Sequence, residues 1–146
     1  MSLRTRLGRL RALAPAERRA LLHALVLLPA YALRLRLFGL RRSLPRARAA
    51  PAPTLPPASL ARLVAAAVHH GPWRARCLPV SLALQHLLQA NGIASRLRVG
   101  VRTVNGRLEA HAWVEQGGVV LLDVDDSGVR FEAFEAAIGE ASGSLR

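Results

Sequence analysis

Residues 77–90 read Cys-Leu-Pro-Val-Ser-Leu-Ala-Leu-Gln-His-Leu-Leu-Gln-Ala, and their spacing predicts a helix from Leu78 to Ala90 directly after the cysteine. Pro79 fits the first turn of a helix, and the pair Asn91-Gly92 is typical of a helix C-terminus. Apolar side chains occupy most of the circumference, which is typical of a buried helix. The sequence therefore places Cys77, the only cysteine of the chain, at the N-terminus of a core helix.

After Gly92 the apolar period changes from 3.6 to 2, which indicates strands. Asn105-Gly106 is a strong signal for a hairpin turn between the first two of them. Three strands and a short terminal helix are expected, over residues 96–102, 107–115, 119–124 and 132–141. The predicted fold class is α+β, in which helices come first and the Cys77 helix packs on a small three-stranded antiparallel meander.

The N-terminal half is rich in Leu and Arg and is expected to form helices. These helices cover residues 3–13, Pro15 to about Leu28, and Ser59 (as the N-cap) to about Val68. Pro29 is expected to bend or break the second helix, which resumes toward Gly39. We divide the chain into a helical segment (1–45), a proline-rich linker (46–57) and a domain that carries Cys77 (58–146).

The composition bounds the partners of the chain. Its net charge of +12 comes from 21 arginines and no lysine, and residues 1–48 contain one acid, Glu17. Such an arm suits nucleic acid, anionic lipid or an acidic peptide, and a solvated helix face explains it equally well. The stretch Ala20–Tyr31 is apolar over about a dozen residues, against about 20 for a membrane span, so an interfacial or core helix is expected.

The lone cysteine excludes an internal disulfide framework and fits a reducing cytoplasm. No CxxC or HExxH motif points to zinc, and no cofactor is expected. At 146 residues, half of them apolar, the chain can form one domain with a core.

Cys77, His111 and Asp123 form the predicted catalytic set, because a thiol at a helix N-terminus followed by a histidine and a carboxylate on paired strands is the layout of a cysteine acyl-transfer enzyme. The positive end of the helix and a protonated His111 would favour the thiolate, which is the nucleophilic form. The helix N–H groups can also hold the oxyanion of a tetrahedral intermediate. Structural alternatives stay open: a buried small cysteine, a core histidine, and a polar turn over 123–128.

The choice of Asp123 depends on the hairpin register. If Gln116-Gly117-Gly118 is a three-residue loop, Glu115 pairs with Val119, and His111 lies directly opposite Asp123. A two-residue Gly-Gly loop would place Asp123 on the other face. Asp125 has the same parity as Asp123 and is the alternative.

The remaining histidines and tryptophans rank lower as site residues. His86 is about 13 Å along the helix from Cys77 and too far to be its base. His69 and His70 are expected in a turn before Cys77 and could approach it, but no carboxylate follows them. His23 is expected on a helix surface. Trp73 and Trp113 are interpreted as packing residues that flank the site in sequence.

The chain contains several spaced blocks: Cys77 to Leu84, Gly92-Ile93, Val99 to Arg102, Ala110 to Glu115, and the N-terminal Leu-rich helix that ends near Phe38-Gly39-Leu40. Together these blocks resemble the transglutaminase-like leader peptidases of lasso-peptide biosynthesis. The resemblance covers most of the chain and is most specific over 77–115. It implies a papain-like Cys-His-Asp protease in which Cys77 attacks the carbonyl of the last leader residue, His111 protonates the departing amine, and Asp123 holds His111.

The resemblance also implies partners. The substrate would be a precursor peptide, and the freed core amine would be used by a cyclase that resembles asparagine synthetase. The first 57 residues lack the strands of a winged-helix leader-binding domain, so a separate leader-binding protein is expected. The basic helices would then dock to that protein, to the cyclase or to a membrane surface. Nucleic acid is not expected, because no aromatic residues are interleaved with the arginines. Two alternatives remain: another transglutaminase-like acyl transferase, and a non-catalytic basic adaptor.

Overall fold

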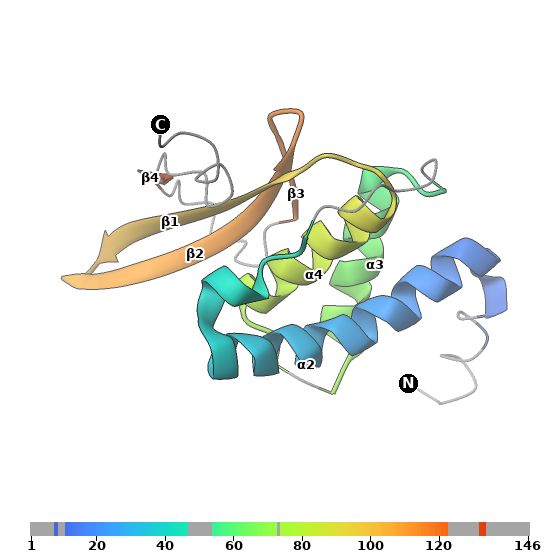
Figure 1. Ribbon diagram of the computed structural model, residues 1–146, viewed down its shortest axis with the longest axis horizontal. Coiled ribbons are helices and arrows are strands. Elements are labelled where there is room, and N and C mark those ends of the chain that lie inside the picture. The colour runs from blue at the N-terminus through green and yellow to red at the C-terminus, as the bar shows by residue number, and fades with distance from the viewer. Residues whose placement is uncertain (1–7, 9–10, 47–53, 73, 123–131, 134–146) are drawn as a thin grey trace, which may run out of the picture.

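The computed structural model describes residues 8, 11–46, 54–72, 74–122 and 132–133. Helices come first and an antiparallel sheet follows, so the α+β prediction is confirmed. Figure 1 shows the sheet on one side of the molecule, with α4 nearest to it and α2 and α3 beyond. The elements are α2 (Pro15–Ser43), α3 (Pro57–His70), α4 (Cys77–Ala90), β1 (Arg96–Val104), β2 (Arg107–Gln116), β3 (Val119–Leu122) and β4 (Glu132–Ala133).

The core lies between the three helices and the inner face of the sheet. It is built from Leu, Val and Ala, as the scarcity of aromatic residues requires. α2 contributes to the same hydrophobic cluster as α3, α4 and β2, since Ala24 and Leu28 are buried in it. The division of the chain at 46–57 stays a prediction, and residues 47–53 lie outside the described part. The largest fully buried hydrophobic side chains are Leu28, Leu60, Val64, Val80, Leu82, Leu84, Leu88 and Val114.

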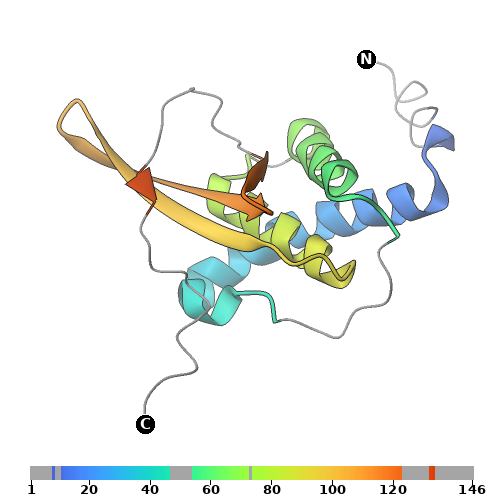
Figure 2. The same ribbon diagram turned by 90° about the horizontal axis from the view of Figure 1, so that it is seen from above.

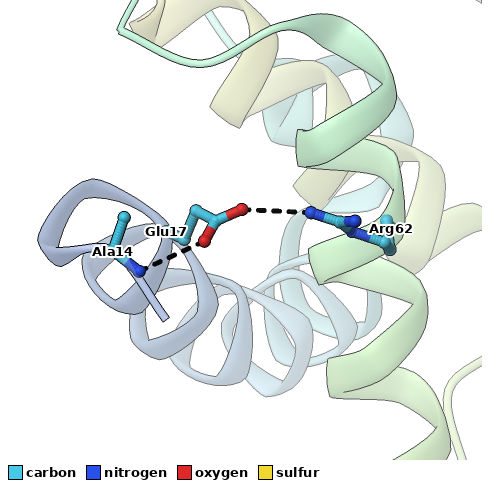
Figure 3. Close-up of polar contacts among 3 residues, drawn as sticks. All are labelled: Ala14, Glu17 and Arg62. Atoms are coloured by element: carbon cyan, nitrogen blue, oxygen red, sulfur yellow. Dashed lines mark hydrogen bonds and ion pairs between the residues drawn. The ribbon is translucent and has the colours of Figure 1, made fainter. Parts of the chain in front are cut away.

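α2 begins as predicted, with Pro15 as its first residue. The Glu17 carboxylate accepts a hydrogen bond from the Ala14 backbone N–H (3.2 Å) and forms an ion pair with Arg62 of α3 (3.0 Å), as Figure 3 shows. The ion pair is exposed and contributes little to stability, but it joins the start of α2 to α3.

Of the two outcomes predicted at Pro29, a bend or a break, the break does not occur. The helix continues through Pro29, and its backbone leaves helical geometry only at Gly39 (φ 73°, ψ 178°). Proline removes one helical hydrogen bond, yet the residues on either side of it, Leu28 and Tyr31, are buried against the other helices and hold the segment in place. Glycine has no Cβ and adopts the left-handed region without strain, so the change of direction falls at Gly39.

Two helix predictions differ from the structure in part. α3 begins at Pro57 with Pro56 as its N-cap, so Ser59 lies in the first turn and does not cap the helix. Its last residue is His70, two residues beyond the predicted end. Most of the helix expected over 3–13 lies outside the described residues. Within that range Gly8, Arg11 and Ala12 are described and are helical.

The β1–β2 hairpin forms as predicted. Asn105 (φ 50°) and Gly106 (φ 75°) take the positive φ values of a type I′ turn, and Val104 pairs with Arg107. Figure 2 shows the tip of this hairpin extending beyond the helices. Accordingly residues 107–110 of β2 are exposed, whereas residues 111–114 are buried. His111 is therefore the first buried residue of β2.

The predicted pairing of Glu115 with Val119 is wrong. Gln116 pairs with Val119 across a two-residue Gly117-Gly118 turn, because both glycines accept positive φ (58° and 80°) and so permit the shortest hairpin. A register shift follows directly, and Val114 pairs with Leu122. The shift adds one residue to β3, as a β-bulge does. Leu122 therefore shares the face of Val114, and not the face that an unshifted pairing would give it.

The sheet has a fourth strand in place of the start of the predicted terminal helix. Glu132 and Ala133 pair antiparallel with Val101 and Gly100, and the strand order is β3-β2-β1-β4. The outer edge of β1 offers unpaired backbone groups, and a strand satisfies them where a helix would not. The rest of that predicted helix, residues 134–141, lies outside the described part of the chain.

Candidate active site

Cys77 is the first residue of α4, and its thiol is free and half-buried. The residue before it, Arg76, has an extended backbone (φ −84°, ψ 160°) and makes no side-chain cap to the helix. The first N–H groups of a helix have no intrahelical acceptor, so this end of α4 favours a negative charge beside Cys77. Pro79 in the first turn supplies no N–H, which leaves those of Cys77 and Leu78.

A buried hydrogen bond joins α4 to β2 beside His111. The Ser81 hydroxyl donates to the carbonyl oxygen of Ala112 at 3.0 Å. Ser81 is one helical turn after Cys77, and residues four apart lie on the same face of a helix. The face of α4 that carries Cys77 is therefore joined to the strand of His111 at Ala112, whose side chain lies on the core face of the sheet, opposite to the face of His111.

His111 is held by neighbours on its own strand face. It is 3% exposed, and its ring stacks on that of Trp113, with 5.9 Å between centroids and 20° between planes. Residues two apart on a strand share a face, which is why these two rings meet. Trp113 thus positions the histidine as well as packing. The alternation His111, Trp113, Glu115 in the sequence is the signal that would have shown this.

The same face continues to an ionic group. The Trp113 indole N–H donates to the Glu115 carboxylate at 2.9 Å. The other oxygen of Glu115 lies 3.2 Å from Arg98 Nε on β1. That distance makes an ion pair, although the Arg98 Nε–H itself makes no hydrogen bond in the structure. A connected row of side chains therefore runs from His111 to Arg98 and restrains the indole against the imidazole.

Asp123 and Asp125 lie outside the described residues, and so does Trp73. The last described pair on that side of the sheet is Val114 with Leu122. Leu122 therefore shares the side-chain face of Val114, which is the face opposite to that of His111.

The other histidines make contacts with one another and with Tyr31. A hydrogen bond of 2.9 Å joins His86 Nδ1 to the Tyr31 hydroxyl, and His23 meets the His86 ring edge-on at 5.5 Å. His86 is thus committed to the α2–α4 contact, as its distance along the helix suggested. His69 and His70 contact each other at the exposed end of α3. Among the described residues, no three His, Cys, Asp or Glu side chains gather as a metal site would require.

Ser81→Ala is expected to lower the stability of the protein by about 1 kcal/mol, because one buried hydrogen bond is lost. It should also lower the kcat of any reaction at Cys77, since it loosens α4 from the strand of His111. Ser43→Ala is the matched control: Ser43 is equally buried and donates to the Gly39 carbonyl (2.8 Å), on α2. Chemical denaturation should show equal losses of stability in the two variants. Turnover measurements should show a defect for Ser81→Ala alone. Equal turnover in the two variants would contradict this role.

Burial raises the pKa of the Tyr31 phenol above its ordinary value of 10.0, against a smaller opposite effect of the Arg34 charge. The unfolded chain therefore ionises first, and the stability that the neutral phenol contributes is lost as pH rises through 10. Tyr31 is the only tyrosine and the chain has no lysine, so no other side chain ordinarily titrates there. We expect the free energy of unfolding to fall by up to about 1.4 kcal/mol per pH unit above pH 10. Tyr31→Phe should remove this dependence, and an unchanged pH profile in that variant would refute the assignment.

The fold and the site define a class: an α+β domain in which a single free cysteine begins a core helix that packs beside a buried histidine strand. The chain belongs to the transglutaminase-like superfamily, since the model of that family's core domain matches residues 7–135. The match includes α2, both site elements and β4. Comparisons with the curated proteins and with the solved structures return no match.

Proposed function

We propose that this protein is a cysteine peptidase that removes the leader from a ribosomally synthesised lasso precursor peptide. The observation that carries the proposal is that the helix begun by Cys77 is joined to the strand that carries His111, through the Ser81–Ala112 hydrogen bond. Membership of the transglutaminase-like superfamily supports Cys-His chemistry at this place. The assignment as a leader peptidase rests on the resemblance of residues 77–115 to the leader peptidases of lasso-peptide biosynthesis.

The reaction begins with the Cys77 thiolate, which attacks the carbonyl carbon of the last leader residue. The developing oxyanion is stabilised by the N–H groups of Cys77 and Leu78 at the start of α4. His111 gives its proton to the nitrogen of the departing core peptide, and the C–N bond breaks. Water, deprotonated by His111, then hydrolyses the leader thioester and regenerates the thiol.

His111 needs a fixed ring orientation for both proton transfers. Trp113 restrains one face of the ring, and a carboxylate would fix the tautomer and stabilise the imidazolium. We propose Asp123 for this role, with Asp125 as the alternative. The support for Asp123 is the family resemblance, because the hairpin register from which it was predicted is not the one observed.

The proposed partners follow from the substrate. A separate winged-helix protein would bind the leader, and a cyclase resembling asparagine synthetase would join the freed core amine to a side-chain carboxylate. We place the reaction in the cytoplasm, where precursor synthesis and a reduced thiol coincide.

A second acyl-transfer outcome is chemically close. If an amine intercepts the Cys77 thioester before water does, the same residues perform amide exchange, and superfamily membership favours this alternative as well. In the non-enzymatic alternative, a basic adaptor, no acyl-enzyme would form.

Mass spectrometry of the protein with precursor and leader-binding partner distinguishes the three alternatives: the peptidase, the acyl transferase and the basic adaptor. Rapid quenching should show a leader-sized adduct on Cys77, followed by free leader and free core in equal amounts. Leader joined to an added amine in place of free leader would establish acyl transfer. An unmodified protein and intact precursor, with leader binding confirmed, would overturn the proposal.

A further inference from the structure

The outer face of α2 carries a row of exposed apolar side chains, which we call the apolar stripe: Leu22, Val26, Leu33 and Leu37. Their exposed fractions are 51, 65, 58 and 64%. The spacings of four, seven and four residues place all of them on one side of the helix. The opposite side is buried on α3 and α4. The stripe is about 22 Å long at 1.5 Å per residue.

The stripe is a local concentration of apolar surface. Five of the eight exposed large hydrophobic residues in the described part of the chain are on α2, Phe38 being the fifth. The others, Leu108, Val119 and Val120, lie on the sheet. Contiguous apolar rows of this kind usually mark a contact surface.

Basic groups border the stripe. Exposed arginines lie at positions 19, 34, 36, 41 and 42 of α2, and no acid occurs between Glu17 and the end of this helix. A cleft of about 620 Å³ lies beside its C-terminal half, lined by Arg34, Arg42 and Arg46, and none of its lining residues is acidic. Ala30 lines the cleft and lies near the stripe on the helix surface, so the two features adjoin.

This combination matches the chemistry of an anionic phospholipid surface. Apolar side chains enter the boundary between headgroups and acyl chains, and guanidinium groups bind the lipid phosphates. The straight row of side chains along one helix suits a plane. The sign of the charge selects anionic over neutral lipid.

The packing of α2 distinguishes a helix that lies on a membrane from one that spans it. By length and composition α2 could span, since an 18-residue window has a mean hydropathy of 1.5 and is only 22% buried. A spanning helix would have to withdraw Ala24, Leu28 and Tyr31 from the core they share with α3 and α4. Only the outer face is available while the domain stays folded.

We propose that α2 docks the protein on the surface of an anionic phospholipid membrane, with the apolar stripe inserted and with Arg34, Arg42 and Arg46 on lipid phosphates. This inference is independent of the peptidase assignment, because it concerns α2, whereas Cys77 lies on α4 and His111 on β2.

Co-sedimentation with vesicles tests the proposal on the full chain. Binding is expected to vesicles of phosphatidylcholine mixed with phosphatidylglycerol, to fall as salt is raised, and to be absent with phosphatidylcholine alone. The double variant Val26→Asn with Leu33→Asn should weaken binding about tenfold, because it removes two inserted side chains. Arg42→Gln with Arg46→Gln should weaken it similarly on the anionic vesicles.

Controls lie on the sheet: Leu108→Asn and Arg107→Gln change an exposed apolar and an exposed basic residue outside α2, and they should bind as wild type. Equal loss in these controls, or equal binding to neutral vesicles, would overturn the proposal. Protein that stays in the membrane after an alkaline carbonate wash would show a spanning α2. A dimer in light scattering that the stripe variant converts to monomer would assign the stripe to a second copy. Binding abolished by soluble glycerol phosphate at unchanged ionic strength would show a free-phosphate site only.

Discussion

Cys77→Ala is expected to abolish cleavage of the precursor peptide, with a fall in rate of about 10⁴-fold or more, because no other group can form the thioester. The thiol is half-buried at the edge of the core, so its removal should leave the fold intact. Initial rates of leader release, measured by mass spectrometry with the leader-binding partner present, give the comparison. Thermal unfolding of the variant provides the control for folding.

The single cysteine allows an independent check on the wild type. Iodoacetamide can form only one thioether, and inactivation should follow the appearance of that adduct one for one. Residual activity in fully alkylated protein, or activity in Cys77→Ala near the wild-type rate, would exclude Cys77 as the nucleophile. The basic adaptor would then be the better interpretation.

His111→Gln is expected to lower the cleavage rate by about 10³-fold, because the leaving amine loses its proton donor and the thiolate its partner. Glutamine keeps a polar side chain of similar length in this 3% exposed position and avoids the cavity that alanine would leave beside Trp113. The rate of Cys77 alkylation at neutral pH should fall as well. A purely structural histidine would affect unfolding without changing that alkylation rate in the folded protein.

The carboxylate proposed to orient His111 can be identified by the same cleavage assay. Asp123→Asn should lower cleavage by about 10²-fold or more, since the histidine loses the group that orients it, whereas Asp125→Asn should retain activity near wild type. The opposite pattern would assign the role to Asp125. Wild-type rates in both variants would show that the Trp113 stack is sufficient to hold His111.

Local sequence signals accounted for the elements that position the site. The start of α4 at Cys77, its end before Asn91-Gly92 and the hairpin at Asn105-Gly106 all follow from residues within a few positions of one another. Such signals act through backbone conformation, proline geometry and glycine φ values, so no distant contact is needed to interpret them. The candidate site residues Cys77 and His111 could be named for the same reason.

The errors occurred where a distant segment outweighs a local preference. Pro29 stays within α2 because the residues around it are buried against α3 and α4. Glu132 and Ala133 join the edge of β1, some thirty residues away, although their local pattern predicts a helix. The register shift after the Gly117-Gly118 turn likewise reflects how β3 pairs along β2, which no local turn rule predicts.

The amino-acid sequence thus contained the fold class, the order of the helices and of the first three strands, and the candidate site residues Cys77 and His111, because periodicity and capping are properties of neighbouring residues. The three-dimensional packing set the approach of Ser81 to Ala112, the stack of Trp113 on His111 and the exposure of one face of α2. These features depend on which surfaces meet. Burial on α3 and α4 uses one side of α2 and leaves Leu22, Val26, Leu33 and Leu37 to the solvent, a distribution that the nearly uniform Leu-rich sequence of that helix does not specify.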